Sequence, residues 1–264
     1  MAWLPALALG ALLGAATPAA AHDTWVRPLP LRPPPASTLT LELSAGHGLR
    51  PLIAPRRRRL LRLGWAGDRT RRVATLRRWT RAGPCARMQI GPPPRRVDCI
   101  ALTTRATLIG IADEGVDGYL AEVQPPPPLL ALWQAQRAVG QPWRERYAKD
   151  AKAYLRTSAH GRCDRRLRVL RQVLELVPRS DPTRLRPGRH LPLELRQHGR
   201  AVADVALRVF DRRGERVVRT DERGRARVLA RCRGRLLIAT TVLQAPALAQ
   251  QPWSSRFATL SLTL

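Results

Sequence analysis

The first part of the chain alternates apolar and polar positions with a period of two, as β-strands do when they bury one face. Leucine occupies every second position from Leu39 to Leu43, and comparable short runs follow it. Proline runs at residues 33–35, 92–94 and 125–128 mark loops or edges between the runs. This pattern predicts antiparallel strands over residues 38–46, 59–65, 71–79 and 99–111.

The same period of two returns after residue 173. Turn sequences at 211–214 and 221–224, each running from aspartate to glycine, divide this region into short apolar segments. Seven short strands with frequent turns are typical of an immunoglobulin-like β-sandwich. The seven predicted strands cover residues 173–178, 190–197, 204–211, 215–221, 226–231, 235–243 and 257–264.

The stretch between these two regions loses the alternation. Residues 118–157 are rich in Ala, Leu, Glu, Gln and Arg, which predicts two or three helices separated by proline within a helical segment of about 114–157. We therefore expect a mainly β protein with two β-sandwich domains. The first covers residues 22–172 and carries the helical insertion, and the second, immunoglobulin-like domain covers residues 173–264.

The first 21 residues form an uncharged apolar run that ends in three alanines. This pattern is typical of a secretory signal peptide and its cleavage site, although the usual basic residue near Met1 is missing. The run predicts export to the periplasm, cleavage after Ala21 and a mature chain that begins at His22 without a membrane span. A retained membrane anchor is the alternative, but a span needs roughly 20 strongly apolar residues.

The formal net charge is +28, which would ordinarily indicate a nucleic-acid or membrane partner. Only Lys149 and Lys152 are lysines among the 47 basic residues, and asparagine does not occur. A composition so dominated by arginine is typical of a GC-rich genome. The arginines are scattered apart from residues 56–59, with no aromatic strip on which bases could stack. We expect no specific nucleic-acid binding, but a non-specific attraction to anionic envelope polymers.

Four cysteines occur, and an oxidising periplasm favours disulfides between them. Their spacing fits no zinc knuckle or ribbon. Of the three connectivities, the pattern favours Cys85–Cys99, which flank one turn-rich segment, together with Cys163–Cys232. Free structural thiols are the alternative.

Several stretches together resemble a family of periplasmic proteins of unknown function associated with nickel uptake. They include AHDTWVRP at 21–28, LSAGHG at 43–48, GYLAEV at 118–123 and RERYAKDAKAYLR at 144–156. The resemblance continues through LELVPRSDPTRLRPG at 174–188, RTDERGRARV at 219–228 and WSSRFATLSLTL at 253–264. It implies two β-sandwich domains and a metal-binding accessory to a membrane transporter of nickel or a related ion. The extreme charge and the cysteine at position 232 depart from the family pattern.

A chain that begins with histidine offers an α-amine and an imidazole that together can chelate a divalent metal. The resemblance adds His47, and Asp23 is a candidate carboxylate ligand. Amine and imidazole donors suit borderline ions such as Ni²⁺, Cu²⁺ and Zn²⁺. The resemblance makes nickel the first candidate, with cobalt, copper or zinc as alternatives. A frayed terminus at His22 and an ordinary turn at His47 are the structural alternatives. We expect Trp25 to be a packing residue, and His160, His190 and His198 to be surface or structural residues.

The sequence contains no catalytic motif of the common hydrolase, metalloprotease or nucleotide-binding types. The acidic cluster of Asp113, Glu114 and Asp117 lacks calcium-loop spacing and instead predicts a helix start. We therefore expect a periplasmic metal-binding accessory protein and not an enzyme. The alternative is a structural or adhesive envelope module that binds anionic polymers through its arginine-rich surface.

Overall fold

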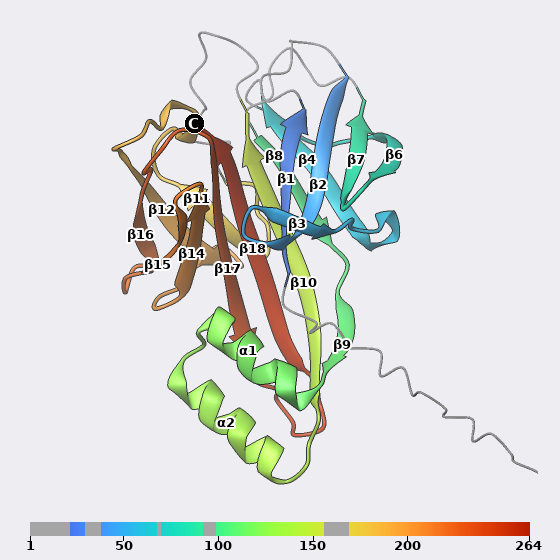
Figure 1. Ribbon diagram of the computed structural model, residues 1–264, viewed down its shortest axis with the longest axis vertical. Coiled ribbons are helices and arrows are strands. Elements are labelled where there is room, and N and C mark those ends of the chain that lie inside the picture. The colour runs from blue at the N-terminus through green and yellow to red at the C-terminus, as the bar shows by residue number, and fades with distance from the viewer. Residues whose placement is uncertain (1–21, 30–37, 68–69, 92–98, 156–168) are drawn as a thin grey trace, which may run out of the picture.

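The computed structural model describes residues 22–29, 38–67, 70–91, 99–155 and 169–264 (Figure 1). The predicted signal peptide, His160 and Cys163 lie outside these residues. The described part of the protein is mainly β, and its two α-helices are α1 (Asp113–Val123) and α2 (Pro127–Ala138). The strands of the first part are β1 (Asp23–Leu29), β2 (Leu39–His47), β3 (Arg50–Ile53), β4 (Leu60–Gly67), β5 (Thr70–Val73), β6 (Leu76–Ala82), β7 (Cys85–Ile90), β8 (Cys99–Thr104), β9 (Thr107–Ile111) and β10 (Trp143–Tyr154).

The second part adds eight strands, and it confirms each of the seven that the sequence predicts. These strands are β11 (Leu174–Pro178), β12 (His190–Gln197), β13 (Arg200–Ala201), β14 (Ala206–Asp211), β15 (Gly214–Arg219), β16 (Arg225–Leu229), β17 (Arg235–Gln244) and β18 (Trp253–Thr263). Short 3-10 helices lie at Arg57–Arg59 and Pro182–Arg184.

The predicted helical segment of about 114–157 is wrong in its last part, because Trp143–Tyr154 forms the long strand β10. Both edges of β10 are paired: β8 and β9 lie antiparallel on one side, and β18 lies parallel on the other. Alanine and glutamate favour helices only weakly, by tenths of a kcal/mol per residue. Hydrogen bonding on two sides and burial of the strand outweigh that preference. Lys149, Lys152 and their tyrosine neighbours therefore lie in a sheet and not on a helix surface.

The strands form three sheets, and the largest one spans most of the molecule (Figure 1). Its nine strands run in the order β15-β14-β17-β18-β10-β8-β4-β5, with β9 paired to β10. A second sheet has the order β1-β2-β7-β6 with β3 on β2, and a third has the order β11-β12-β13 with β16 on β12. The parallel β10–β18 pair joins the first and second parts of the chain within one sheet. The domain division at residues 172/173 stays a prediction.

Hydrophobic cores fill the spaces between these layers. One core lies between the β1-β2-β7-β6 sheet and the β4-β8-β10 side of the large sheet, and includes Leu41, Met88 and Leu102. Another lies between the third sheet and β14, β17 and β18. A third core packs the two helices, through residues such as Trp133, against β10, β17 and β18. The helices thus cover one end of the long central strands, as Figure 1 shows.

The cysteines are not joined as the sequence predicts. No disulfide connects any two of the three described cysteines, and both Cys85 and Cys232 carry free thiols. Cys85 begins β7 and accepts a hydrogen bond from Ser44 Oγ at 3.2 Å, whereas Cys99 begins β8 in the large sheet. The predicted Cys85–Cys99 and Cys163–Cys232 disulfides are therefore wrong for this structure. Sequence proximity suggested the first pair, but the two strands belong to different sheets.

The acidic cluster begins a helix, as the sequence predicts. Helix α1 starts at Asp113, with Asp113 and Glu114 in its first turn, where the helix dipole favours negative charge. Arg137 at the end of α2 lies 3.6 Å from Asp113 and 3.1 Å from Asp117, which ties the two helices together. Among the described residues, no helix has the length and apolar character needed to cross a membrane.

Candidate metal centre

Antiparallel pairing of β1 with β2 brings His22 and His47 together. Asp23 lies opposite Gly46 in this register, so the preceding residue His22 lies beside His47, the last residue of β2. The two imidazole ring centroids are 6.1 Å apart, and their planes are inclined by 64°. The side chain of His47 is 49% exposed, which leaves the pair open to solvent. The structure thus brings together the two histidines that the sequence places 25 residues apart.

The glycines beside His47 serve the fold itself. A Cβ at Gly46 would lie 2.1 Å from the carbonyl oxygen of Arg50, across the irregular β2–β3 pairing. Gly48 has a φ of +53°, and a Cβ there would lie 2.8 Å from the Phe210 ring. Gly46 therefore allows the backbone of β3 to approach closely, and Gly48 allows the turn directly after His47.

A network of charged side chains lies next to the two histidines, on the side away from solvent. The Arg208 guanidinium donates to both carboxylate oxygens of Asp23, each at 2.9 Å, and also to Glu122 on α1. The other oxygen of Glu122 lies 3.6 Å from His47 Nε2. Asp23 is fully buried and Arg208 is nearly so. The network thus connects the start of β1, the end of α1 and the middle of β14 to the histidine pair.

Burial shifts the ionisation of the groups in this network. It raises the pKa of Asp23 to about 6, against the opposing charge of Arg208. It lowers the pKa of Lys149 to about 8, against the opposing charge of Asp23. Burial, followed by the charges of Lys149 and His47, also lowers the pKa of His22. The imidazole of His22 consequently favours its neutral form, which is the form that binds a metal.

Lys149 holds the backbone next to the first histidine. Its ammonium group donates to the carbonyl oxygen of His22 and lies 5.1 Å from the centre of the Phe257 ring and 5.3 Å from that of Tyr147. An ammonium is a compact charge that fits between two rings, where a planar guanidinium is larger. Lys149 therefore fixes the position of the residue at which the mature chain is predicted to begin.

The predicted ligand Asp23 has a different partner in this structure. Both of its carboxylate oxygens are occupied by Arg208, whereas Glu122 directs one oxygen toward His47. The described residues contain no group of three or more His, Cys, Asp or Glu side chains that could hold a metal ion by themselves. Given metal–nitrogen bonds of about 2.1 Å, two imidazoles on one ion place their ring centroids about 6.5 Å apart when they lie on opposite sides of it, and about 5.3 Å apart in a tetrahedral site. At 6.1 Å the histidine pair lies between these values, so a tetrahedral ion requires the two rings to move closer by about 1 Å.

The other residues predicted near this site have structural positions. Trp25 is buried against Phe210, Leu237 and Ala239, which confirms that it is a packing residue. His190 begins β12 and His198 directly follows its end, so these histidines lie at the two ends of one strand. Neither shares a site with the histidine pair.

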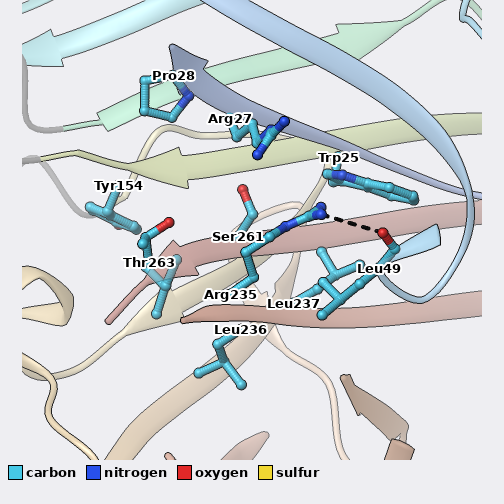
Figure 2. Close-up of a pocket in the computed structure, with 11 residues that line it drawn as sticks. Trp25, Arg27, Pro28, Leu49, Tyr154, Arg235, Leu236, Leu237, Ser261 and Thr263 are labelled. Carbon is cyan, nitrogen blue, oxygen red and sulfur yellow. Dashed lines mark hydrogen bonds between the residues drawn. The ribbon is translucent and has the colours of Figure 1, made fainter. Parts of the chain in front are cut away.

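A small cavity lies on the other side of Trp25, between β1 and the strands β17 and β18 (Figure 2). Figure 2 shows Arg27 and Arg235 on its wall together with Ser261, and Arg235 donates to the carbonyl oxygen of Leu49 at 3.4 Å. Burial and the neighbouring Arg27 lower the pKa of Arg235. The cavity volume is about 20 Å³, which is enough for roughly one water molecule. It is a packing void between two sheets and not a ligand site.

Sequence reasoning missed Glu122, Lys149 and Arg208. No spacing connects them to the histidines, because they lie on α1, β10 and β14 and meet only when these elements pack. One signal was present: the chain has only two lysines, and both lie in β10, Lys149 within this site and Lys152 in a buried ion pair. At both positions the ammonium group fits a confined site, because it is more compact than a guanidinium.

Comparison with known proteins adds no assignment: no protein-family model and no curated protein sequence matches the chain. The resemblance to the nickel-uptake family therefore stays a prediction, and the function has to be inferred from the site.

Proposed function

We propose that the protein is a periplasmic metal-binding accessory whose site is the histidine pair at the start of the mature chain. The ion is a divalent transition metal, with nickel first and cobalt, copper or zinc as alternatives, and the partner is a membrane metal transporter. Cleavage after Ala21 frees the α-amine of His22 as a third nitrogen ligand. The arrangement as two sandwich domains, the second immunoglobulin-like, belongs to the same proposal.

The observation that carries this proposal is the 6.1 Å separation of the two imidazoles at a solvent-exposed edge. Two further features support it. The lowered pKa of His22 favours the neutral imidazole that a metal requires. Glu122 lies within 3.6 Å of His47 and supplies an additional oxygen on the same side. Asp23 takes the role of an orienting residue, because it holds Arg208, which in turn donates to Glu122.

The test compares two forms of the mature protein by calorimetry with Ni²⁺, Co²⁺, Cu²⁺ and Zn²⁺. One form begins at His22, and the other carries Met-Ala before His22, which converts the α-amine into an amide but leaves the imidazole intact. We expect the extension to weaken binding by more than the roughly 10- to 100-fold that the loss of an outer-shell partner costs. Equal affinity of the two forms would exclude the N-terminal chelate.

Side-chain variants separate the ligands from their surroundings. We expect His22→Ala and His47→Ala each to weaken binding strongly, and Glu122→Gln to weaken it less. His190→Ala and His198→Ala are matched controls, because each removes a histidine at an end of β12. If His190→Ala or His198→Ala weakened metal binding and the variants at His22 and His47 did not, the metal would lie outside the histidine pair.

The alternative function is an envelope module that binds anionic polymers. Binding of a polyanion that is sensitive to salt and indifferent to chelators would favour this alternative. Stoichiometric metal binding that a chelator abolishes would favour the metal-binding accessory.

A further inference from the structure

The positive charge of the protein is concentrated in one part of the chain. Residues 50–105 contain sixteen arginines and two aspartates, so these 56 residues carry +14 of the net +28. They include strands β3 to β8, and Figure 1 shows β4, β6, β7 and β8 at the end of the molecule opposite the helices. A uniform compositional bias would have spread this charge over the whole chain.

The described arginines of this segment also lack carboxylate partners among the described residues. None of those whose side chains the structure describes forms an ion pair with a carboxylate of the described residues. Arg59 donates instead to the hydroxyl groups of Thr107 and Tyr147. Arg56, Arg57 and Arg58 are exposed. Their charges are therefore available to an anionic partner.

Three of these arginines border a groove. The groove has a volume of about 360 Å³ and lies between the segment after β3 and the strands β6 and β7. Arg56, Arg57 and Arg81 line it, together with the partly buried ring of Trp79 and the side chain of Ile53. The groove combines guanidinium groups, which match phosphate geometry, with an indole ring, which favours the boundary between apolar and aqueous surroundings.

Exposed aliphatic side chains lie next to these charges. Leu52 is 42% exposed and Ile53 is 54% exposed, both on β3. A soluble polyanion binds through charge and gains little from contact with aliphatic side chains. The headgroup region of a membrane accommodates both the apolar groups and the arginines. We propose that this arginine groove docks the protein on an anionic lipid surface, with lipid phosphates held by Arg56, Arg57 and Arg81. It involves none of the residues of the histidine pair, so the proposal is independent of metal binding.

Vesicle sedimentation tests the proposal on the mature full-length protein. The vesicles are phosphatidylcholine alone and phosphatidylcholine mixed with phosphatidylglycerol. We expect binding only to the mixed vesicles and weaker binding at higher salt. The triple variant R56Q/R57Q/R81Q should bind about 100-fold more weakly, since each arginine at an anionic surface contributes roughly a fivefold factor.

The matched control removes the same charge from the other half of the molecule. Arg200, Arg212 and Arg227 are exposed and have no ion pair within the described residues. R200Q/R212Q/R227Q should retain binding within about fivefold. An equal loss in the two triple variants would overturn the proposal, because net charge alone would then explain the attraction.

Two further measurements address the partner. L52S/I53S keeps every charge, and it should weaken vesicle binding while leaving binding to heparin, a soluble polyanion, unchanged. Wild-type protein that binds heparin but not the mixed vesicles would overturn the lipid proposal in favour of a soluble polymer. Unaltered thermal unfolding of each variant shows that its fold is intact.

Discussion

Two regions of this protein use the same abundant residue in opposite ways. Residues 50–105 leave their described arginines without carboxylate partners, whereas residues 173–264 pair eight of their eighteen arginines with carboxylates. The second region contains eight acidic residues and the first only two. The number of arginines reflects composition, but the few carboxylates decide which arginines support the fold and which remain available to a partner.

Asp211 shows how one carboxylate engages several arginines. Arg231 donates to both of its oxygens at 2.8 and 2.9 Å, and Arg216 donates at 2.9 Å. The backbone amide of Arg213 adds a further bond at 2.8 Å. The hydrogen bonds from Arg231 hold the pKa of Asp211 far below its ordinary value, against burial, which raises it. These bonds fix the β14–β15 turn against the residues that follow β16.

The largest effect is expected where the two parts of the chain meet. Lys152 on β10 pairs with Glu175 on β11, and both side chains are at most 2% exposed. Lys152→Met leaves Glu175 buried without its countercharge, which should lower the free energy of unfolding by about 3–5 kcal/mol. Chemical denaturation measures this change. The double variant Lys152→Met/Glu175→Gln should recover much of the loss, and no recovery would contradict a role for the uncompensated charge.

A smaller loss of free energy of unfolding is expected at Asp211, the carboxylate that pairs with Arg216 and Arg231. Asp211→Asn weakens the hydrogen bonds from three residues and should lower the free energy of unfolding by about 2–3 kcal/mol. Asp204→Asn is the matched control, because Asp204 pairs with Arg219 at the exposed surface. The control should cost less than about 1 kcal/mol. Equal effects of the two substitutions would show that the several bonds to Asp211 stabilise the protein no more than the single exposed ion pair of Asp204.

The lowered pKa of Asp211 should also make the stability of the protein depend on pH in the acid range. A carboxyl group whose pKa is lowered by folding stabilises the protein fully above its unfolded-state pKa, near 3.9 for aspartate. That stabilisation is lost as the pH falls toward the lower folded-state value. Denaturation between about pH 5 and pH 2 should therefore show a steeper decline for wild type than for Asp211→Asn. Parallel curves would show that Asp211 does not have a depressed pKa.

The smallest effect on stability is expected in residues 50–105, whose described arginines have no carboxylate partner. R56Q/R57Q/R81Q should change the free energy of unfolding by less than about 0.5 kcal/mol per site, since these side chains make no ion pair with a described carboxylate. Arg231→Gln in the paired region should cost more, about 1–2 kcal/mol, because it removes two bonds to Asp211. A large loss in the first variant would mean that the arginine groove belongs to the stabilising framework.

Strand positions were largely predictable from the sequence. The alternation of leucine in β2 and the turn residues around β14 to β16 act locally, so their period and spacing sufficed. Part of the site was predictable as well: the signal-peptide pattern indicated His22, and the family resemblance indicated His47. The antiparallel register of β1 and β2, which the alternation did not predict, places the two histidines side by side.

Other features depended on contacts that no local pattern encodes. The segment of β10 has helix-favouring composition and becomes a strand only because β8, β9 and β18 pair with it. Cys85 and Cys99 are close in sequence but lie in different sheets. Glu122 and Arg208 reach the histidine pair only through the packing of α1 and β14.

The sequence by itself therefore determined the β class, the two helices and the charge, because each depends on composition or on short-range periodicity. It also indicated His22 and His47 as candidates, but their pairing follows from the register of β1 and β2 in the structure. The tertiary structure decided the strand β10, the separation of Cys85 from Cys99, and the assembly of Glu122, Lys149 and Arg208 behind the histidines. It also decided which arginines are neutralised. The physical reason is that pairing and burial act between residues far apart in the chain, and they outweigh local preferences of a few tenths of a kcal/mol.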